Sequence, residues 1–312
     1  MRSGVVLAVA LAAGILTATA SADGLPVFDV DVGPSGVVDS SGESRYVTLL
    51  LGRRTLVGRI ERDGGRVVRF RELRGSFTLP AVAYDGSAAG LSPDGRRLVL
   101  ITPRLGFPRH TTRFAVLDPR TLRVGKTLTL AGDYSFDALS PDGRWMYLIR
   151  YTSGEDPLQY EVVALDLRSG RLADEPIVDP REPDEQMNGN PLTRATSADG
   201  RWAYTLYEGR EHPFVHALDT ARRDARCIDL DWLAGRKGLR ALRLALRDGG
   251  RELVVQTPKD DAVAVVDTET FEAAKPRSAG LGPWPKTGLS SLALLLVVLG
   301  LLYAVRSRRR TT

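Results

Sequence analysis

A short phrase of the form Ser-Pro-Asp-Gly-Arg recurs along the chain and constrains its fold more than any other feature. The aspartates of successive copies are 48, 57 and 49 residues apart. The copies, from the clearest to the weakest, are Ser92-Pro93-Asp94-Gly95-Arg96, Ser140-Pro141-Asp142-Gly143-Arg144, Ser197-Ala198-Asp199-Gly200-Arg201 and Asp248-Gly249-Gly250-Arg251. A nearly fixed period of this length indicates a protein built from repeated supersecondary units.

A second phrase follows each copy and keeps nearly the same period. It is a short apolar run that ends in an aspartate, at Asp118, Asp166, Asp219 and Asp267. Because two independent markers share the spacing, we predict a repeating unit of about 48 residues. A fifth, degenerate copy is expected first, with residues 41–47 as turn and strand and residues 55–60 as the next strand.

The residues of the two phrases indicate how one unit folds. In Ser-Pro-Asp-Gly the proline presets φ, the aspartate bonds its own backbone and the glycine accepts a left-handed φ, so the phrase predicts a tight hairpin. The runs at 98–101 and 145–149 are rich in β-branched and aromatic residues, as expected of buried strands. The second phrase should end a third strand at a turn capped by its aspartate, and a fourth strand such as 126–130 completes the unit.

Four-stranded units with this period predict an all-β fold, a β-propeller of about 5–7 blades that spans residues 23–277. Residues 27–32 could help to complete or close the ring. The copies resemble the WD40-like repeats with an SPDGR turn found in TolB-type and YVTN-type bacterial propellers, over about residues 40–275. The resemblance implies the fold and leaves the function open, because such blades serve as binding platforms, scaffolds and domains attached to enzymes.

The first 22 residues are typical of a secretory signal peptide. They place one positive charge at Arg2, an apolar run over residues 4–16 and small residues up to Ala22. A first transmembrane helix is the alternative, but this apolar core is short against the roughly 20 residues needed to span a bilayer. We therefore expect cleavage before Asp23 and export.

The other end of the chain predicts a membrane anchor. Residues 278–288 read as a linker, residues 289–305 as a single transmembrane helix and residues 306–312 as a basic tail with four arginines. The arginines should keep the tail cytoplasmic and leave the bulk of the chain outside. A buried core helix is the alternative, but such helices rarely end in clustered arginines at a chain terminus.

Pro285-Lys286-Thr287-Gly288 precedes this apolar segment. The arrangement of motif, apolar span and basic tail resembles the cell-wall sorting signal of Gram-positive surface proteins. The resemblance implies that a sortase cuts between Thr287 and Gly288 and joins the threonine to the wall. The family has leucine where this chain has Trp284, and a Trp-Pro pair at a membrane interface is an alternative explanation. Permanent membrane anchoring and sortase processing therefore both remain open.

The charges give no indication of a nucleic-acid partner. The whole chain is formally +5, but six of its 43 basic residues lie in the terminal segments, while all 38 acidic residues lie in between. The expected ectodomain therefore carries 37 basic against 38 acidic residues, and no global field favours nucleic acid. Cys227 is the only cysteine, so an intrachain disulfide is impossible, and its place in an expected strand predicts a small buried apolar residue.

The 57-residue interval contains an acidic insertion at residues 174–192, the clearest candidate for a binding loop. It could hold a cation or a basic partner, or it could be a solvated excursion with no function. The residues that we single out are Asp179, Glu182, Asp184, Glu185 and Asn188.

Motifs for catalysis and metal binding are weak. His212 and His216 are four residues apart and would share a face of a strand, but no further ligand accompanies them. The sequence lacks the Gly-x-Ser-x-Gly and His-Glu-x-x-His motifs, and we expect no cofactor. The sequence thus predicts an exported, envelope-anchored binding or scaffolding module with a protein or cell-wall partner. A lactonase-like enzyme with a metal in the propeller funnel and an accessory subunit of a membrane complex are the alternatives.

Overall fold

The computed structural model of the chain describes residues 36–63, 65–184 and 187–276. The chain divides into two compact units, residues 1–274 and 275–312, and the fold below is that of the first. The expected signal peptide, the segment 27–32, the anchor helix and the Pro285–Gly288 motif lie outside the described residues. Within the described part of the chain, none of the helices has the length and apolar character needed to span a membrane.

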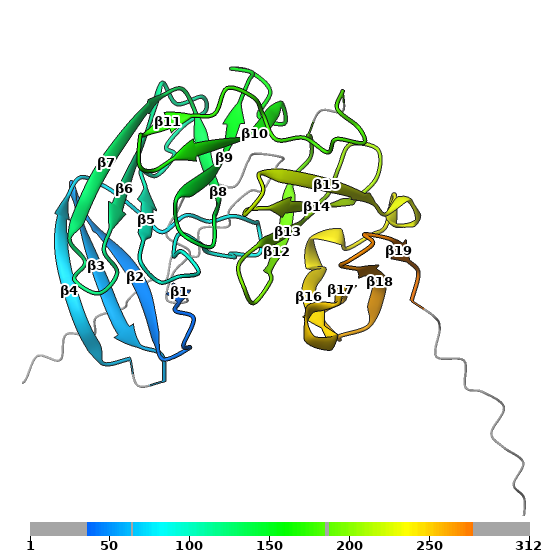
Figure 1. Cartoon of the computed structure of the whole chain (residues 1–312), viewed down its shortest axis with the longest axis horizontal. Helices are drawn as coiled ribbons and strands as arrows, with labels where there is room; N and C mark the ends of the chain where they lie inside the picture. Colours follow the sequence, from blue (N-terminus) through cyan, green and yellow to red (C-terminus); the bar gives the residue numbers. More distant parts are fainter. Residues whose placement is uncertain (1–35, 64, 185–186, 277–312) are drawn as a thin grey trace, which may run out of the picture. The chain divides into compact units, whose positions relative to one another are not determined.

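The described residues form five antiparallel sheets that follow one another in chain order (Figure 1). The first sheet contains β1 (Val37–Val38), β2 (Ser44–Leu51), β3 (Arg54–Glu61) and β4 (Val67–Arg74). The second contains β5 (Leu98–Ile101), β6 (Thr111–Leu117) and β7 (Val124–Ala131). The third contains β8 (Tyr134–Leu139), β9 (Trp145–Tyr151), β10 (Tyr160–Asp166) and β11 (Arg171–Leu172).

The last two sheets repeat the same four-stranded plan. The fourth contains β12 (Pro191–Thr196), β13 (Trp202–Tyr207), β14 (Phe214–Asp219) and β15 (Asp224–Asp229). The fifth contains β16 (Arg243–Arg247), β17 (Glu252–Gln256), β18 (Ala262–Asp267) and β19 (Ala273–Ala274). Three single-turn 3-10 helices, η1 (Asp231–Leu233), η2 (Leu239–Ala241) and η3 (Asp248–Gly250), lie in or beside this last sheet. The prediction of an all-β fold made of four-stranded antiparallel units is confirmed, with three named strands in the second sheet.

The repeated phrases occupy the positions predicted for them. Between β8 and β9, the Asp142 carboxylate accepts hydrogen bonds from the Ser140 hydroxyl at 2.6 Å and the Arg144 N–H at 3.0 Å. Gly143 follows with φ +64°, a conformation that residues with a side chain resist. At the end of β6, the Asp118 carboxylate accepts the N–H of Thr121 at 2.9 Å, as expected of a turn cap. Each phrase therefore performs a local structural task.

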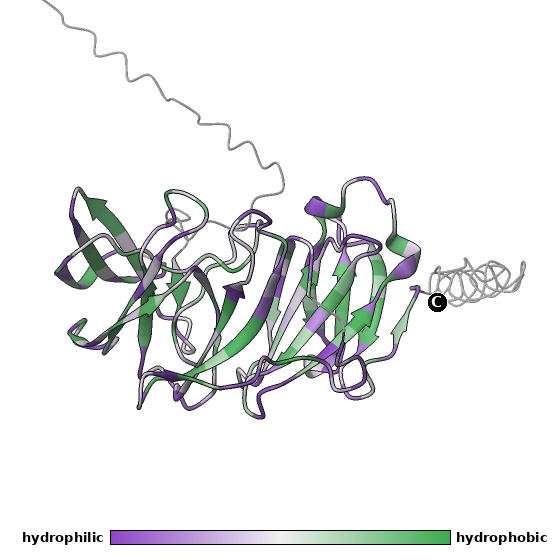
Figure 2. Ribbon diagram, turned by 90° about the horizontal axis from the view of Figure 1, so that it is seen from above, coloured by the Kyte–Doolittle hydropathy of each residue, from purple (hydrophilic) through white to green (hydrophobic). Residues whose placement is uncertain are grey.

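Apolar side chains join each sheet to the next. Along β9, Met146 and Leu148 pack in a cluster shared with the second sheet, while Tyr147 and Ile149 pack in a cluster shared with the fourth. Alternate residues of a strand point to opposite faces, so an inner sheet buries both of its faces against its neighbours. Figure 2 shows that hydrophobic residues are concentrated in the strands.

The first strand of each complete sheet lies on the inner side of the array and its last strand lies on the outer side (Figure 1). In the second sheet the inner position is taken by an irregular segment, where the Gly90 carbonyl accepts the N–H of Val99 at 2.7 Å. Sheets stacked face to face with their first strands inward are the construction of propeller blades. The described part of the chain contains four four-stranded sheets and one three-stranded sheet.

Candidate functional site

The acidic insertion begins by folding back over its own sheet. After β11, the backbone N–H of Ile177 donates to the carbonyl of Val162 on β10 at 2.8 Å and forms an isolated bridge. The Ile177 side chain is buried, so apolar contact holds the insertion on β10. Residues 174–176, by contrast, are exposed.

Asp179 then ties the insertion to the neighbouring sheet. Its carboxylate is 3% exposed and accepts hydrogen bonds from the backbone N–H of Cys227 at 2.9 Å and from the Arg181 guanidinium at 2.5 Å. Arg181 also donates to the Cys227 carbonyl at 2.9 Å. Because Cys227 lies on the edge strand β15, these two side chains satisfy backbone groups that the strand turns outward.

The electrostatics of Asp179 follow from the same contacts. Burial by itself would raise the pKa of this carboxyl group, but the hydrogen bonds from Arg181 and from the Cys227 N–H outweigh burial and lower the pKa below its usual value. Arg226 lies 3.9 Å from the carboxylate and adds a weaker attraction. Asp179 is therefore ionised at neutral pH, and its charge is already compensated by the protein.

A cavity of about 260 Å³ lies between the insertion, β10 and the strands β14 and β15. Its apolar lining includes Tyr160, Ile177, Met187 and Phe214, and its polar lining includes Asn188, His216 and Cys227. Ligand pockets of drug-sized molecules run from roughly 300 to 1,000 Å³, so this cavity suits a smaller molecule.

His216 is a buried polar side chain that lines this cavity. It lies on β14, is 2% exposed and meets the Tyr207 ring edge-on, with centroids 6.3 Å apart. Among the described residues neither of its ring nitrogens has a hydrogen-bond partner. Burial lowers the pKa of His216 to about 4, so the ring is neutral at pH 7 and offers one donor and one acceptor.

His216 and Cys227 are direct partners in the pairing of β14 with β15. The backbone groups of Cys227 point outward to Asp179 and Arg181, which makes this a non-hydrogen-bonded pair whose side chains lie close together. The thiol and the imidazole therefore share one wall of the cavity. Cys227 is partly exposed, so the prediction of a buried apolar cysteine was wrong, because the strand that carries it is an edge strand.

The candidate loop residues of the sequence analysis are largely brought together. Asp179, Glu182, Asp184 and Asn188 all line the cavity, whereas Glu185 lies outside the described residues. Their roles differ. Asp179 bonds to Arg181 and to the backbone of Cys227, whereas Glu182 and Asp184 are exposed and have no ion pair among the described residues. Sequence reasoning did not connect His216 with this loop. Its position in an otherwise apolar strand, Phe214 to Leu218, is the signal that could have done so.

No metal site accompanies these groups in the part of the chain that the structure describes, where no cluster of three or more His, Cys, Asp or Glu side chains could hold an ion. The Nδ1 atom of His212 lies 3.5 Å from Asp231 and 3.8 Å from Asp229 at the surface. His216 faces the cavity instead, so the two histidines have different surroundings.

The inner side of the sheets is largely occupied by protein, with two small cavities of about 30 and 90 Å³ beside Asp137. Residues 80–90 turn back on themselves and pair with β12, where the N–H of Tyr84 donates to the Pro191 carbonyl at 2.9 Å. Nearby, the buried side chains of Asp137 on β8 and Arg194 on β12 form an ion pair.

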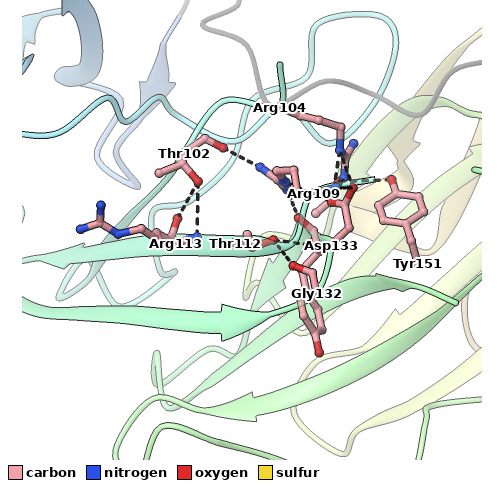
Figure 3. Close-up of polar contacts among 10 residues, drawn as sticks. Thr102, Arg104, Arg109, Thr112, Arg113, Gly132, Asp133 and Tyr151 are labelled. Carbon is pink, nitrogen blue, oxygen red and sulfur yellow. Dashed lines mark hydrogen bonds and ion pairs between the residues drawn. The ribbon is translucent and has the colours of Figure 1, made fainter. Parts of the chain in front are cut away.

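A second buried polar network joins the β5–β6 connection to the third sheet (Figure 3). Arg104 and Arg109 converge on Asp133, with contacts of 2.7 and 3.0 Å, and Arg104 also lies 4.6 Å from the centre of the Tyr151 ring. Asp133 and both guanidinium groups are almost fully enclosed. These groups satisfy one another, so the network stabilises the loop at residues 102–110.

Among known proteins, the chain shows similarity to solved structures alone. No protein-family model matches the sequence, and no curated protein matches it. Hydrazine synthase of Kuenenia stuttgartiensis is 15% identical, with TM-score 0.46 over 74% of this chain and 70% of that one. TolB from Acinetobacter baumannii is 15% identical, with TM-score 0.45 over 77% of this chain and 53% of that one. The β-propeller domain of Cps50 (Swd1) from Myceliophteria thermophila is 14% identical, with TM-score 0.42 over 76% and 68%.

Proposed function

We propose that the protein is a binding module of the cell envelope, and that its binding site is the cavity beside the acidic insertion. The stacked blades supply a rigid scaffold, and a long insertion on such a scaffold is a common place for recognition. The observation that carries the proposal is His216, a neutral, 2% exposed imidazole that lines the cavity without a hydrogen-bond partner among the described residues.

Among the described residues, the ring nitrogens of His216 are not fully enclosed, so a molecule in the cavity can reach them. A ligand that enters the cavity and bonds to His216 binds the folded protein alone, so binding and stability are coupled. The surrounding wall of Tyr160, Phe214 and Met187 would bury the apolar part of such a ligand. This combination of a few polar groups on an apolar wall is typical of small-molecule sites.

A fragment screen tests this site directly. Ligand-detected NMR with neutral and charged fragments of fewer than about fifteen heavy atoms should give hits that compete with one another for one site. Cys227→Trp places an indole in the cavity and should abolish the hits, whereas Asp229→Trp at the exposed end of the same strand should leave them. Hits that survive Cys227→Trp would contradict the assignment of the site.

The envelope location rests on the terminal segments, with the signal peptide at residues 1–22 and the apolar span at 289–305. A tag placed after Ala22 would allow the native protein to be fractionated and weighed intact. Extraction by detergent with a mass that runs from Asp23 to Thr312 supports a single-span membrane protein. Release by wall-digesting enzymes alone, with the chain ending at Thr287 and carrying a peptidoglycan fragment, supports sortase processing. Recovery from the cytoplasm would contradict both.

A further inference from the structure

We infer that the cavity takes a compact organic cation: a small molecule with one ammonium or guanidinium group, a short apolar body and a neutral hydrogen-bonding group. This inference rests on the proposed function, because it names the ligand class of the same site. It combines three independent features of the cavity, namely its charge, its apolar wall and His216.

The charge of the cavity wall is negative. The ionised side chains that line it are four carboxylates, Glu161, Asp179, Glu182 and Asp184, and no lysine or arginine side chain of the described chain lines it. Two of the carboxylates are compensated from outside the cavity: Glu161 by Arg150 at 2.5 Å and Asp179 by Arg181. The other two, Glu182 and Asp184, have no ion pair among the described residues, so the wall repels anions and attracts cations.

The apolar part of the wall determines the size and character of the apolar part of the ligand. The rings of Tyr160 and Phe214 and the side chains of Ile177 and Met187 line the cavity, and all but Met187 are buried. Aromatic rings favour flat or compact apolar bodies and also attract a nearby cation. At about 260 Å³ the cavity accommodates one ring or a short chain.

His216 sets the third requirement. Its neutral ring offers one donor and one acceptor inside an enclosed wall, and it has no partner among the described residues. A second ammonium group against the imidazole would bring an uncompensated charge into this buried position, which is costly. A hydroxyl or amide group satisfies the imidazole without that cost, so the cation belongs at Glu182 and Asp184 and the neutral group at His216.

Three probes that share a 4-ethylphenol skeleton test the role of charge. Tyramine adds a positive charge to this skeleton, 4-ethylphenol itself is neutral, and 3-(4-hydroxyphenyl)propionate adds a negative charge. Calorimetry with the full-length chain in detergent should find tyramine bound about five-fold or more tighter than 4-ethylphenol, since two partly solvated carboxylates contribute modestly. The propionate should bind more weakly than 4-ethylphenol.

Variants of the insertion complete the test. Glu182→Gln with Asp184→Asn should reduce tyramine affinity to that of 4-ethylphenol and leave 4-ethylphenol unchanged. The matched control, Asp174→Asn with Glu175→Gln, removes two exposed acids of the same insertion that do not line the cavity and should change neither affinity.

The outcomes separate this inference from the proposed function. If 4-ethylphenol binds as tightly as tyramine and Cys227→Trp abolishes both, the cation preference is overturned and the cavity remains a binding site. If none of the three probes binds the wild-type protein, both the ligand class and the proposed function are overturned. The ligand class is also overturned if the control variant and the cavity variant lose tyramine affinity to the same extent.

Discussion

The Asp179 carboxylate and the backbone N–H of Cys227 are joined by a 2.9 Å hydrogen bond that links residues 48 positions apart. This bond attaches the insertion of the third sheet to the edge strand of the fourth. It closes one side of the cavity and at the same time covers an edge that would otherwise be open to pairing with another chain. The proposed binding site therefore lies at the junction between the third and fourth sheets.

Asp179→Ala should destabilise the protein by about 2 kcal/mol, because it leaves a strand N–H unsatisfied and removes the partner of Arg181. Arg181→Ala should cost about 0.5 kcal/mol, since the Arg181 side chain is 53% exposed. Urea unfolding of both variants gives the comparison. Equal losses for the two would contradict the view that the bond to Cys227 dominates.

Stability should depend on pH through His216. The pKa of this histidine is lowered by burial from 6.5 to about 4, so the unfolded chain binds the proton more readily as the pH falls below 6.5. Its contribution is fully present above pH 6.5 and is lost down to about pH 4, a total of about 3 kcal/mol.

The measurement is the difference in unfolding free energy between wild type and His216→Asn across this pH range. The wild type should lose about 2 kcal/mol more than the variant between pH 7 and pH 5. His212→Asn, at the surface beside Asp229 and Asp231, serves as the matched control for replacing a histidine by asparagine. A His216→Asn profile parallel to the wild type would contradict the neutral, buried imidazole.

Asp133→Asn should be among the most destabilising polar substitutions. It leaves the guanidinium groups of Arg104 and Arg109 enclosed with no counter-charge, which costs about 4 kcal/mol for buried pairs of this kind. Asp156→Asn breaks the exposed contact with Arg210 and should cost about 0.5 kcal/mol. Thermal unfolding of both variants provides the comparison, and similar melting temperatures would contradict a structural role for the network.

The glycines of the repeated turn should differ in their tolerance of alanine. Gly95 has φ +65° and open space around it, so Gly95→Ala should cost about 1 kcal/mol from the backbone alone. Gly200 has φ +72°, and an added Cβ would lie 2.1 Å from the ring of Pro93, so Gly200→Ala should cost about 2 kcal/mol more. Chemical denaturation checks the order, and a more damaging Gly95→Ala would contradict the packing of these turns.

The antiparallel sheets could be predicted because their signals are local. Proline, aspartate and glycine in one turn impose the same backbone wherever they recur, and Asp94, Asp142 and Asp199 all accept bonds within their own turns. The missing inner strand of the second sheet could not be predicted. Residues 80–90 instead pair with β12, about a hundred residues away, and no local sequence pattern predicts this long-range pairing.

The site was predictable only in part. An acidic insertion in a repeat predicts an exposed loop, and Glu182 and Asp184 are indeed exposed. Asp179 differs because its neighbours in space, Cys227 and Arg226, lie on a strand of the next sheet. The role of His216 depends on the same long-range packing, which buries its ring and creates the cavity that it lines.

The response of the three histidine rings, His110, His212 and His216, to tyramine in nitrogen-labelled protein tests directly whether the cavity is the binding site. We predict that the His216 ring resonances shift in proportion to bound tyramine while those of His212 and His110 stay in place. Shifts confined to His212, which lies beside the exposed acids Asp229 and Asp231, would place tyramine on the surface and contradict the cavity as the binding site.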